Sequence, residues 1–287
     1  MDKSLTIGTL VTYNTILYYF ITPIRESLNF YRELFYIGSS IKRINSLLDY
    51  KEEDLSKPKK LNMMGGIYFK NLDYSYNNRD LILKDITLLL PPATRLMILG
   101  KSGSGKSTLL KILYKHYEIP RDKVFISGYD INDFNLSDIR ENIAYISQNE
   151  YLYSDTIRNN ILLDRNIKEE EFLKVCQITH VTDIVKNKSL SYNFRLEENG
   201  TNISGGERKR IILARALLKP SSIILIDEGL NELDINLERD ILENIFSLYP
   251  YKLFIVISHR PNNMDLFTKV IKIDNGSLVK GLNKYVW

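Results

Sequence analysis

The sequence predicts an α/β fold with a parallel core sheet and an antiparallel β annex, and three observations support this prediction. The runs "SIILIDE" (222–228) and "KLFIVIS" (252–258) are continuously apolar, as in strands buried on both faces of a parallel sheet. The segments 67–76 and 81–90 carry β-branched and aromatic residues in strand-length pieces. Near the end, "KVIKIDNGSLVK" (269–280) places Asn-Gly between two strand-like runs, which predicts a hairpin.

The composition of the chain excludes several classes of protein. The chain has 287 residues, 44% of them hydrophobic, so it can bury a sizeable core. Its net charge of +4 is small and its basic residues are scattered, which argues against a nucleic-acid partner. A single cysteine, Cys176, excludes an intramolecular disulfide framework and fits a reducing compartment. No signal-peptide pattern begins the sequence.

The N-terminal part differs from the rest. Residues 4–24 carry no charge, a length that fits a bilayer span, but Asn14, Pro23 and several threonines leave an amphipathic or buried helix as an equal alternative from hydropathy alone. Residues 28–48 have apolar side chains every three or four positions, which predicts a helix. We therefore expect a membrane helix with its cytoplasmic extension over 1–50, a charged linker over 51–65, and the α/β domain over 66–287.

The stretch "GKSGSGKST" lies between the strand-like 94–99 and a predicted helix from Lys106, and it matches the phosphate-binding pattern G-x-x-x-x-G-K-[ST]. Its glycines allow backbone N–H groups to point at phosphates, Lys106 reaches the β and γ phosphates, and the Ser107 hydroxyl ligates Mg²⁺. The alternative is a glycine-rich turn that binds no nucleotide, but the strand before the loop and the helix after it make this alternative less favoured. The predicted ATP-contacting residues of the loop are Gly100, Lys101, Ser102, Gly103, Ser104, Gly105, Lys106, Ser107 and Thr108.

Two adjacent carboxylates end the apolar run 223–226. Asp227 is predicted to hold Mg²⁺ together with Ser107. Glu228 is predicted to polarise the attacking water as a general base, which a binding-only switch would not need. Acids that merely mark a strand end are common, but they are a weaker explanation beside a phosphate loop.

The segment "ISGGERKR" (203–210) puts a serine and two glycines at a helix start, where free N–H groups favour an anion. With ATP placed at Lys106, the chain resembles the ATP-binding cassette (ABC) family, whose signature "LSGGQ" corresponds to residues 203–207 with Ile for Leu and Glu for Gln. The resemblance implies that Ser204, Gly205 and Gly206 close on the γ-phosphate held by a second cassette.

Other family motifs follow in order over residues 66–280. The resemblance implies that Tyr76 stacks on adenine, that Gln148 in "AYISQN" senses Mg²⁺, and that His259 in "VISHR" contacts the γ-phosphate. The resemblance also implies that Asp234, in the loop after the catalytic carboxylate, is one of the ATP-binding residues. The sequence "DEGLNELD" departs from the family's usual "DEATSALD", which leaves Asp227, Glu228 and Asp234 in place but could alter coupling between sites. The family fold implied is a phosphate-loop NTPase cassette with a helical subdomain.

The resemblance also extends to function. Residues 5–24 look like the last transmembrane helix of exporters for bacteriocins, lantibiotics or competence peptides, so we expect a fragment or one piece of a split exporter, without a leader peptidase. The implied partners are a second cassette, the remaining membrane helices and a peptide cargo, with the cassette on the cytoplasmic side of the cell membrane. The alternatives kept open are export of a lipid or drug, a non-hydrolysing ATP-binding remnant, a soluble ABC ATPase acting on DNA or ribosomes, and a kinase.

Overall fold

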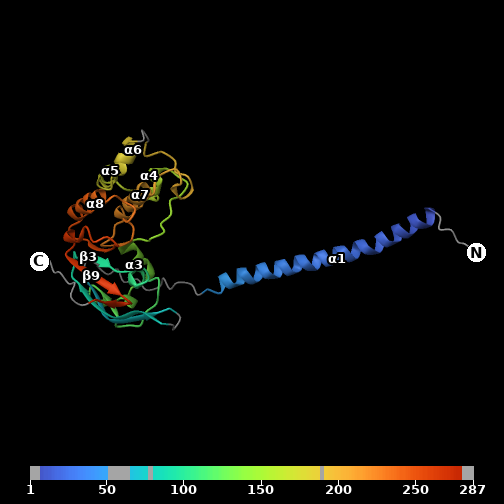
Figure 1. The fold of residues 1–287 in the computed structure, drawn as a ribbon, viewed down its shortest axis with the longest axis horizontal. Coiled ribbons are helices and arrows are strands. Elements are labelled where there is room, and N and C mark those ends of the chain that lie inside the picture. The colour runs from blue at the N-terminus through green and yellow to red at the C-terminus, as the bar shows by residue number, and fades with distance from the viewer. Residues whose placement is uncertain (1–6, 51–64, 77–79, 188–190, 280–287) are drawn as a thin grey trace, which may run out of the picture. The chain divides into compact units, whose positions relative to one another are not determined.

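The computed structural model describes residues 7–50, 65–76, 80–187 and 191–279. The chain divides into two compact units, residues 1–53 and 54–287 (Figure 1). The predicted linker lies outside the described residues, apart from Gly65. All predicted site residues belong to the second unit.

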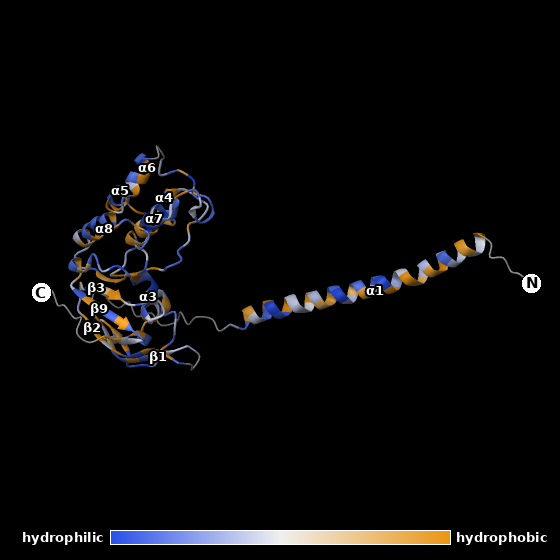
Figure 2. Cartoon of the chain, in the orientation of Figure 1, coloured by the Kyte–Doolittle hydropathy of each residue, from blue (hydrophilic) through white to orange (hydrophobic). Residues whose placement is uncertain are grey.

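The described part of the first unit is a helix, α1 (Ile7–Leu48), of 42 residues with no buried side chain. Its C-terminal half confirms the helix predicted from the apolar repeat over 28–48. Hydrophobic and hydrophilic residues are interspersed along its length (Figure 2). Among the residues that the structure describes, no helix is both long and apolar enough to cross a membrane. Threonines and Asn14 interrupt the apolar residues of that segment.

The second unit is built on a six-stranded sheet that confirms the predicted parallel core. Its strand order is β10-β9-β3-β8-β7-β6, and all neighbours are parallel except β9 and β10. Asn275 and Gly276 both have positive φ, 47° and 83°, as the tight turn of the β9–β10 hairpin requires. The bounds are β3 Arg95–Leu99, β6 Ile143–Ile146, β7 Ile223–Asp227, β8 Leu253–Ile257, β9 Lys269–Asp274 and β10 Ser277–Leu278.

Every residue of β7 and of β8 is buried because the sheet is covered on both faces. Side chains alternate between faces along a strand. Ile224 and Ile226 therefore pack into one apolar core, whereas Ile223 and Leu225 pack into the other. This arrangement explains why the sequence shows an unbroken apolar run at β7 rather than an alternating one.

The predicted antiparallel annex is present as a four-stranded sheet with the order β2-β1-β4-β5. It shares the second core with the phosphate-loop helix, since Ile67 and Phe69 of β1 cluster with Leu109 and Leu110. The bounds are β1 Ile67–Ser75, β2 Leu81–Leu90, β4 Val124–Ile126 and β5 Tyr129–Asp130.

Helices α4, α5 and α6 form a group that packs on α7, and this group corresponds to the predicted helical subdomain (Figure 1). Its apolar residues, such as Ile161 and Phe172, belong to the same core as Ile211 of α7 and Ile241 of α8. The bounds are α2 Lys106–Leu113, α3 Leu136–Asn142, α4 Ile157–Leu162, α5 Glu169–Ile178, α6 Val181–Asn187, α7 Gly205–Leu217 and α8 Ile235–Leu248.

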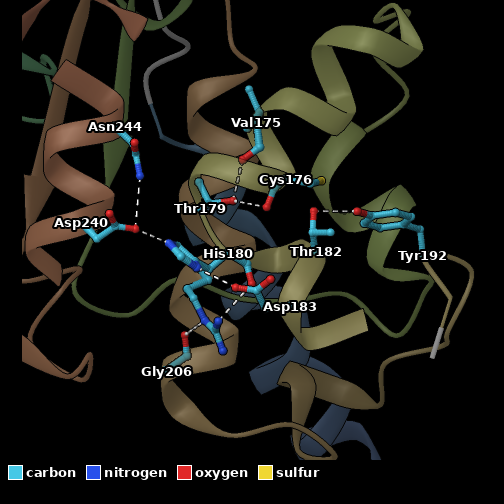
Figure 3. Close-up of polar contacts among 11 residues, drawn as sticks. Val175, Cys176, Thr179, His180, Thr182, Asp183, Tyr192, Gly206, Asp240 and Asn244 are labelled. Atoms are coloured by element: carbon cyan, nitrogen blue, oxygen red, sulfur yellow. Dashed lines mark hydrogen bonds and ion pairs between the residues drawn. The ribbon is translucent and has the colours of Figure 1, made fainter. Parts of the chain in front are cut away.

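A histidine connects the helical group to α8. The ring nitrogens of His180, between α5 and α6, lie 2.7 Å from an Asp183 carboxylate oxygen and 2.5 Å from an Asp240 oxygen on α8 (Figure 3). Arg210 of α7 donates to the His180 carbonyl oxygen at 3.0 Å. Three helices that meet only through tertiary folding are thus joined at one residue.

Candidate active site

The loop 100–105 connects β3 to α2 and depends on its glycines. Gly100, Gly103 and Gly105 have φ values of 152°, 78° and 100°, which side-chain-bearing residues rarely adopt. A Cβ on Gly100 would overlap the Ile273 carbonyl oxygen, and one on Gly105 would lie 2.9 Å from the Ile82 carbonyl oxygen. Only glycine at these positions lets the loop keep this path.

Inside the loop lies the ammonium group of Lys106, which donates to the carbonyl oxygens of Gly100 at 2.9 Å and Lys101 at 2.7 Å. Burial lowers the pKa of Lys106, while the nearby charges of Glu228 and Asp227 oppose that shift. Within the described residues, the buried Ser104 hydroxyl has no hydrogen-bond partner. A buried cation and an unpaired hydroxyl in a glycine loop at a helix start fit a bound phosphate group.

Asp227 ends β7 beside the start of α2. Its Oδ1 accepts a hydrogen bond from the Ser107 hydroxyl at 2.9 Å, and its Oδ2 accepts one from the Tyr145 hydroxyl at 3.2 Å. Burial raises the pKa of Asp227, and both hydrogen bonds counteract the rise. A carboxylate and a hydroxyl side by side are the oxygen ligands that Mg²⁺ prefers, so this pair fits the ion.

Glu228 sits between two side chains from the segments that follow β6 and β8. Its Oε1 lies 2.6 Å from His259 Nε2, and its Oε2 accepts from Gln148 Nε2 at 3.2 Å. The Glu228 backbone has a φ of 57°, in the left-handed region that is costly for a residue with a side chain. The side chain is 16% exposed, so the carboxylate is held in place and still reachable.

The parallel register brings these three side chains together. Ile146 of β6 pairs with Ile226, and Asp227 pairs with Ile257 of β8. The segments that follow the three strands therefore leave the sheet at one edge. This edge is where open α/β sheets bind ligands.

The signature segment forms a helix start with a capping box. Ser204 is the N-cap of α7: its hydroxyl accepts from the Glu207 N–H at 3.3 Å, and its own N–H donates to Glu207 Oε2 at 2.8 Å. The start of α7 is therefore capped by two residues of the signature itself, and one of them is Glu207, which stands where the family usually has Gln.

Two predicted ligand contacts have other partners here. The hydroxyl of Tyr76 lies 2.9 Å from that of Thr108, and the ring packs edge-on against Tyr117. Asp234 is the N-cap of α8 and accepts from the N–H groups of Asn236 and Leu237. Tyr76 thus lies beside α2 and Asp234 begins α8, and these contacts explain both positions without a ligand.

Comparison with known proteins identifies the family. A family model described as ABC transporter matches residues 83–231, which include the phosphate loop, the signature and Asp227–Glu228. This chain belongs to the ABC transporter family. It carries the ATP-binding ATPase cassette of that family, and the fold class predicted from sequence is confirmed.

Several ABC relatives cover both units of the chain. The transport/processing ATP-binding protein ComA of Streptococcus pneumoniae is 32% identical over 98% of this chain and 40% of its own length. The lipid A-core flippase 1 of Colwellia psychrerythraea is 31% identical over 98% of this chain and 49% of its own. A bacterial Atm1-family ABC exporter solved with ATP bound has a TM-score of 0.77 and 26% identity, covering 96% of this chain and 49% of that one. The chain thus spans less than half the length of these proteins.

Three residues of this ABC cassette contact the predicted site although the sequence did not predict a role for them. Tyr145 donates to Asp227, as described above. Lys209 of α7 donates from Nζ to the Gln148 carbonyl oxygen at 2.9 Å, and Glu232 packs against the start of α7. The sequence offered one signal, the unusual "GLNE" that contains Glu232. Tyr145 and Lys209 had none, because their partners lie 82 and 61 residues away.

Proposed function

We propose that this cassette hydrolyses ATP in a dimer of cassettes and thereby powers export of a peptide. The observation that carries the hydrolytic part is Glu228, a carboxylate fixed between His259 and Gln148 next to the phosphate loop. A nucleotide-binding remnant would have no use for a general base held in this way. The same geometry disfavours the non-hydrolysing alternative.

In this proposal the residues of the loop 100–108 bind the ATP phosphates, with Lys106 turning from the loop carbonyls to the β and γ phosphates. Ser107 and Asp227 hold Mg²⁺, which when bound neutralises charge on the phosphate oxygens. Gln148 completes that ligand set. Tyr76 stacks on the adenine ring once its hydroxyl leaves Thr108.

The chemical step assigned to Glu228 is proton removal from water. As the water oxygen bonds to the γ-phosphorus, the Glu228 carboxylate takes the water proton, and the bond from phosphorus to the β–γ bridging oxygen breaks with its electron pair leaving on ADP. His259, 2.6 Å from Glu228, orients that carboxylate and contacts the γ-phosphate.

A second copy completes the site. Ser204, Gly205 and Gly206 present the start of α7 as an anion cradle for the ATP held by the other cassette, and Asp234 lies beside that interface. Hydrolysis then removes the γ-phosphate that joins the two copies, and the dimer reopens.

The cargo assignment follows the relatives. ComA and the lactococcin-A transport/processing protein LcnC of Lactococcus lactis, 30% identical over 98% of this chain, support peptide export. Export of a lipid is the second candidate, supported by the similarity to lipid A-core flippases. We propose that residues 1–50 belong to the membrane part of such an exporter and couple it to the cassette over 66–287, on the cytoplasmic face of the cell membrane.

The test is Mg²⁺-dependent ATP turnover of the full chain, measured against protein concentration, beside Lys106→Ala. We expect specific activity to rise with concentration, because two copies build each site, and we expect the variant to lose ATP binding. Turnover unchanged in Lys106→Ala would contradict the site. ATP binding without turnover at any concentration would contradict the hydrolytic function and leave the remnant as the better account.

A further inference from the structure

The loop between β7 and α8 carries a glutamate that the proposed mechanism does not use. Glu232 stands in "DEGLNELD", where this chain departs from the family's usual residues. Its carboxylate lies against Gly205, the first residue of α7, so closely that a Cβ on that glycine would overlap Oε2. A negative charge therefore rests on the first turn of the signature helix.

A buried lysine keeps the carboxylate there. Lys209 Nζ lies 3.8 Å from Glu232 Oε1, and the lysine side chain is only 8% exposed. The same ammonium group donates to the Gln148 carbonyl oxygen at 2.9 Å, which fixes its position. Glu232 is 54% exposed, so it can leave this contact for solvent without a change in the fold.

The start of α7 now faces two carboxylates. Glu207 already caps the helix through its hydrogen bond to the Ser204 N–H. Glu232 adds a second negative charge at the end of the helix whose positive dipole favours an anion. A phosphate approaching the same turn would be repelled by the carboxylate, because like charges at close range oppose each other.

We propose that Glu232 is a positioning residue that acts as an internal anion: in the separate cassette its carboxylate rests on the cradle Ser204–Gly206, and it must swing away before ATP held by a second copy can dock there. This inference rests on the proposed function, since it assigns a regulating group to the same cradle. Glu232 sets how readily two ATP-loaded cassettes close and leaves ATP binding by a single cassette unaffected.

The experiment measures ATP-dependent dimerisation of the full chain by sedimentation velocity, with Glu228→Gln as the background that holds ATP unhydrolysed. We expect Glu232→Gln in this background to dimerise about tenfold more tightly at low salt, because the amide keeps the shape and removes the charge. The difference should shrink in 0.5 M salt, where the Debye length is only about 4 Å. ATP affinity of the dilute monomer should not change.

Two control variants separate charge from structure. Glu170→Gln removes one exposed charge from α5, away from the signature, and should leave the dimer constant unchanged. Glu232→Asp keeps the charge and should resemble the background. If Glu232→Gln dimerises no more tightly than the background, or if salt does not reduce the gain, the role proposed for Glu232 is overturned and the cassette dimer itself still stands. If the background itself forms no dimer with ATP, the proposed cassette dimer fails and the role of Glu232 fails with it.

Discussion

Replacing Glu228 by glutamine separates catalysis from folding in this cassette. The two carboxylate oxygens accept hydrogen bonds from His259 and Gln148, at 2.6 and 3.2 Å. An amide keeps the shape and one acceptor, and the imidazole can accept from the new NH₂ group by changing tautomer. At most one hydrogen bond is lost, so the free energy of unfolding should fall by about 1 kcal/mol.

The catalytic effect should be far larger than the structural one. A positioned general base contributes about 10²–10⁴ to the rate, and an amide cannot take a proton from water. We therefore expect phosphate release under saturating Mg²⁺-ATP to fall by at least about 100-fold, while ATP binding persists. Thermal denaturation without nucleotide measures the stability of both proteins, and Glu170→Gln serves as the surface control.

The result that would refute this reasoning is specific. Turnover within about tenfold of the unaltered chain would show that Glu228 is not the base, since a rate loss that small falls short of general-base catalysis. A large loss of both turnover and stability would show that the Glu228 contacts mainly hold the fold together. Only loss of turnover with retained ATP binding and a near-normal unfolding temperature supports the assignment.

Three further changes test the structure around the site. Burial raises the pKa of Asp227, so the folded state holds the carboxyl proton more tightly than the unfolded state does, and the protein loses stability as pH rises above the ordinary value of 3.8. Without Mg²⁺, the unfolding temperature of Asp227→Asn minus that of the unaltered chain should therefore be larger at pH 7 than at pH 4. An equal difference at both pH values would contradict this. The partly buried guanidinium of Arg215 donates to three oxygens at 2.7–3.0 Å, so Arg215→Ala should lower the free energy of unfolding by about 3 kcal/mol in urea denaturation. Arg239, whose side chain is 40% exposed and ion-paired at the surface, should lose under about 1 kcal/mol when replaced by alanine. An asparagine at position 180 tolerates the left-handed backbone but is too short to reach Asp240, so His180→Asn should lower the free energy of unfolding by about 1 kcal/mol. An unchanged urea midpoint would show that the contact between His180 and Asp240 contributes nothing to stability.

Much of the second unit could be predicted because its signals are local. The phosphate loop occupies consecutive residues between one strand and one helix, and its glycines are required by backbone geometry at each position. The Asn-Gly hairpin depends on two adjacent positive φ values. The buried strands can be predicted from unbroken apolar runs, since both faces of the sheet are covered.

The N-terminal segment is where the local signals of the sequence are weakest. The absence of charge and the length of residues 4–24 suggest a membrane span, whereas no helix among the described residues is both long and apolar enough to cross a membrane. The helical repeat over 28–48 was a stronger signal, and it is found in α1. Periodicity reports the backbone conformation, whereas the absence of charge does not by itself report the surroundings of a helix.

The family, the phosphate loop and the order of the motifs could be predicted from the amino-acid sequence, because each depends on residues that are neighbours in the chain. Which side chains contact one another at the site depends instead on how distant segments pack in the folded chain. Gln148 and His259 reach Glu228 because the register of β6, β7 and β8 sends three distant loops to one sheet edge. Glu232 reaches Gly205 because α7 packs beside the loop that precedes α8. Long-range pairing sets these contacts, and no spacing along the chain encodes them.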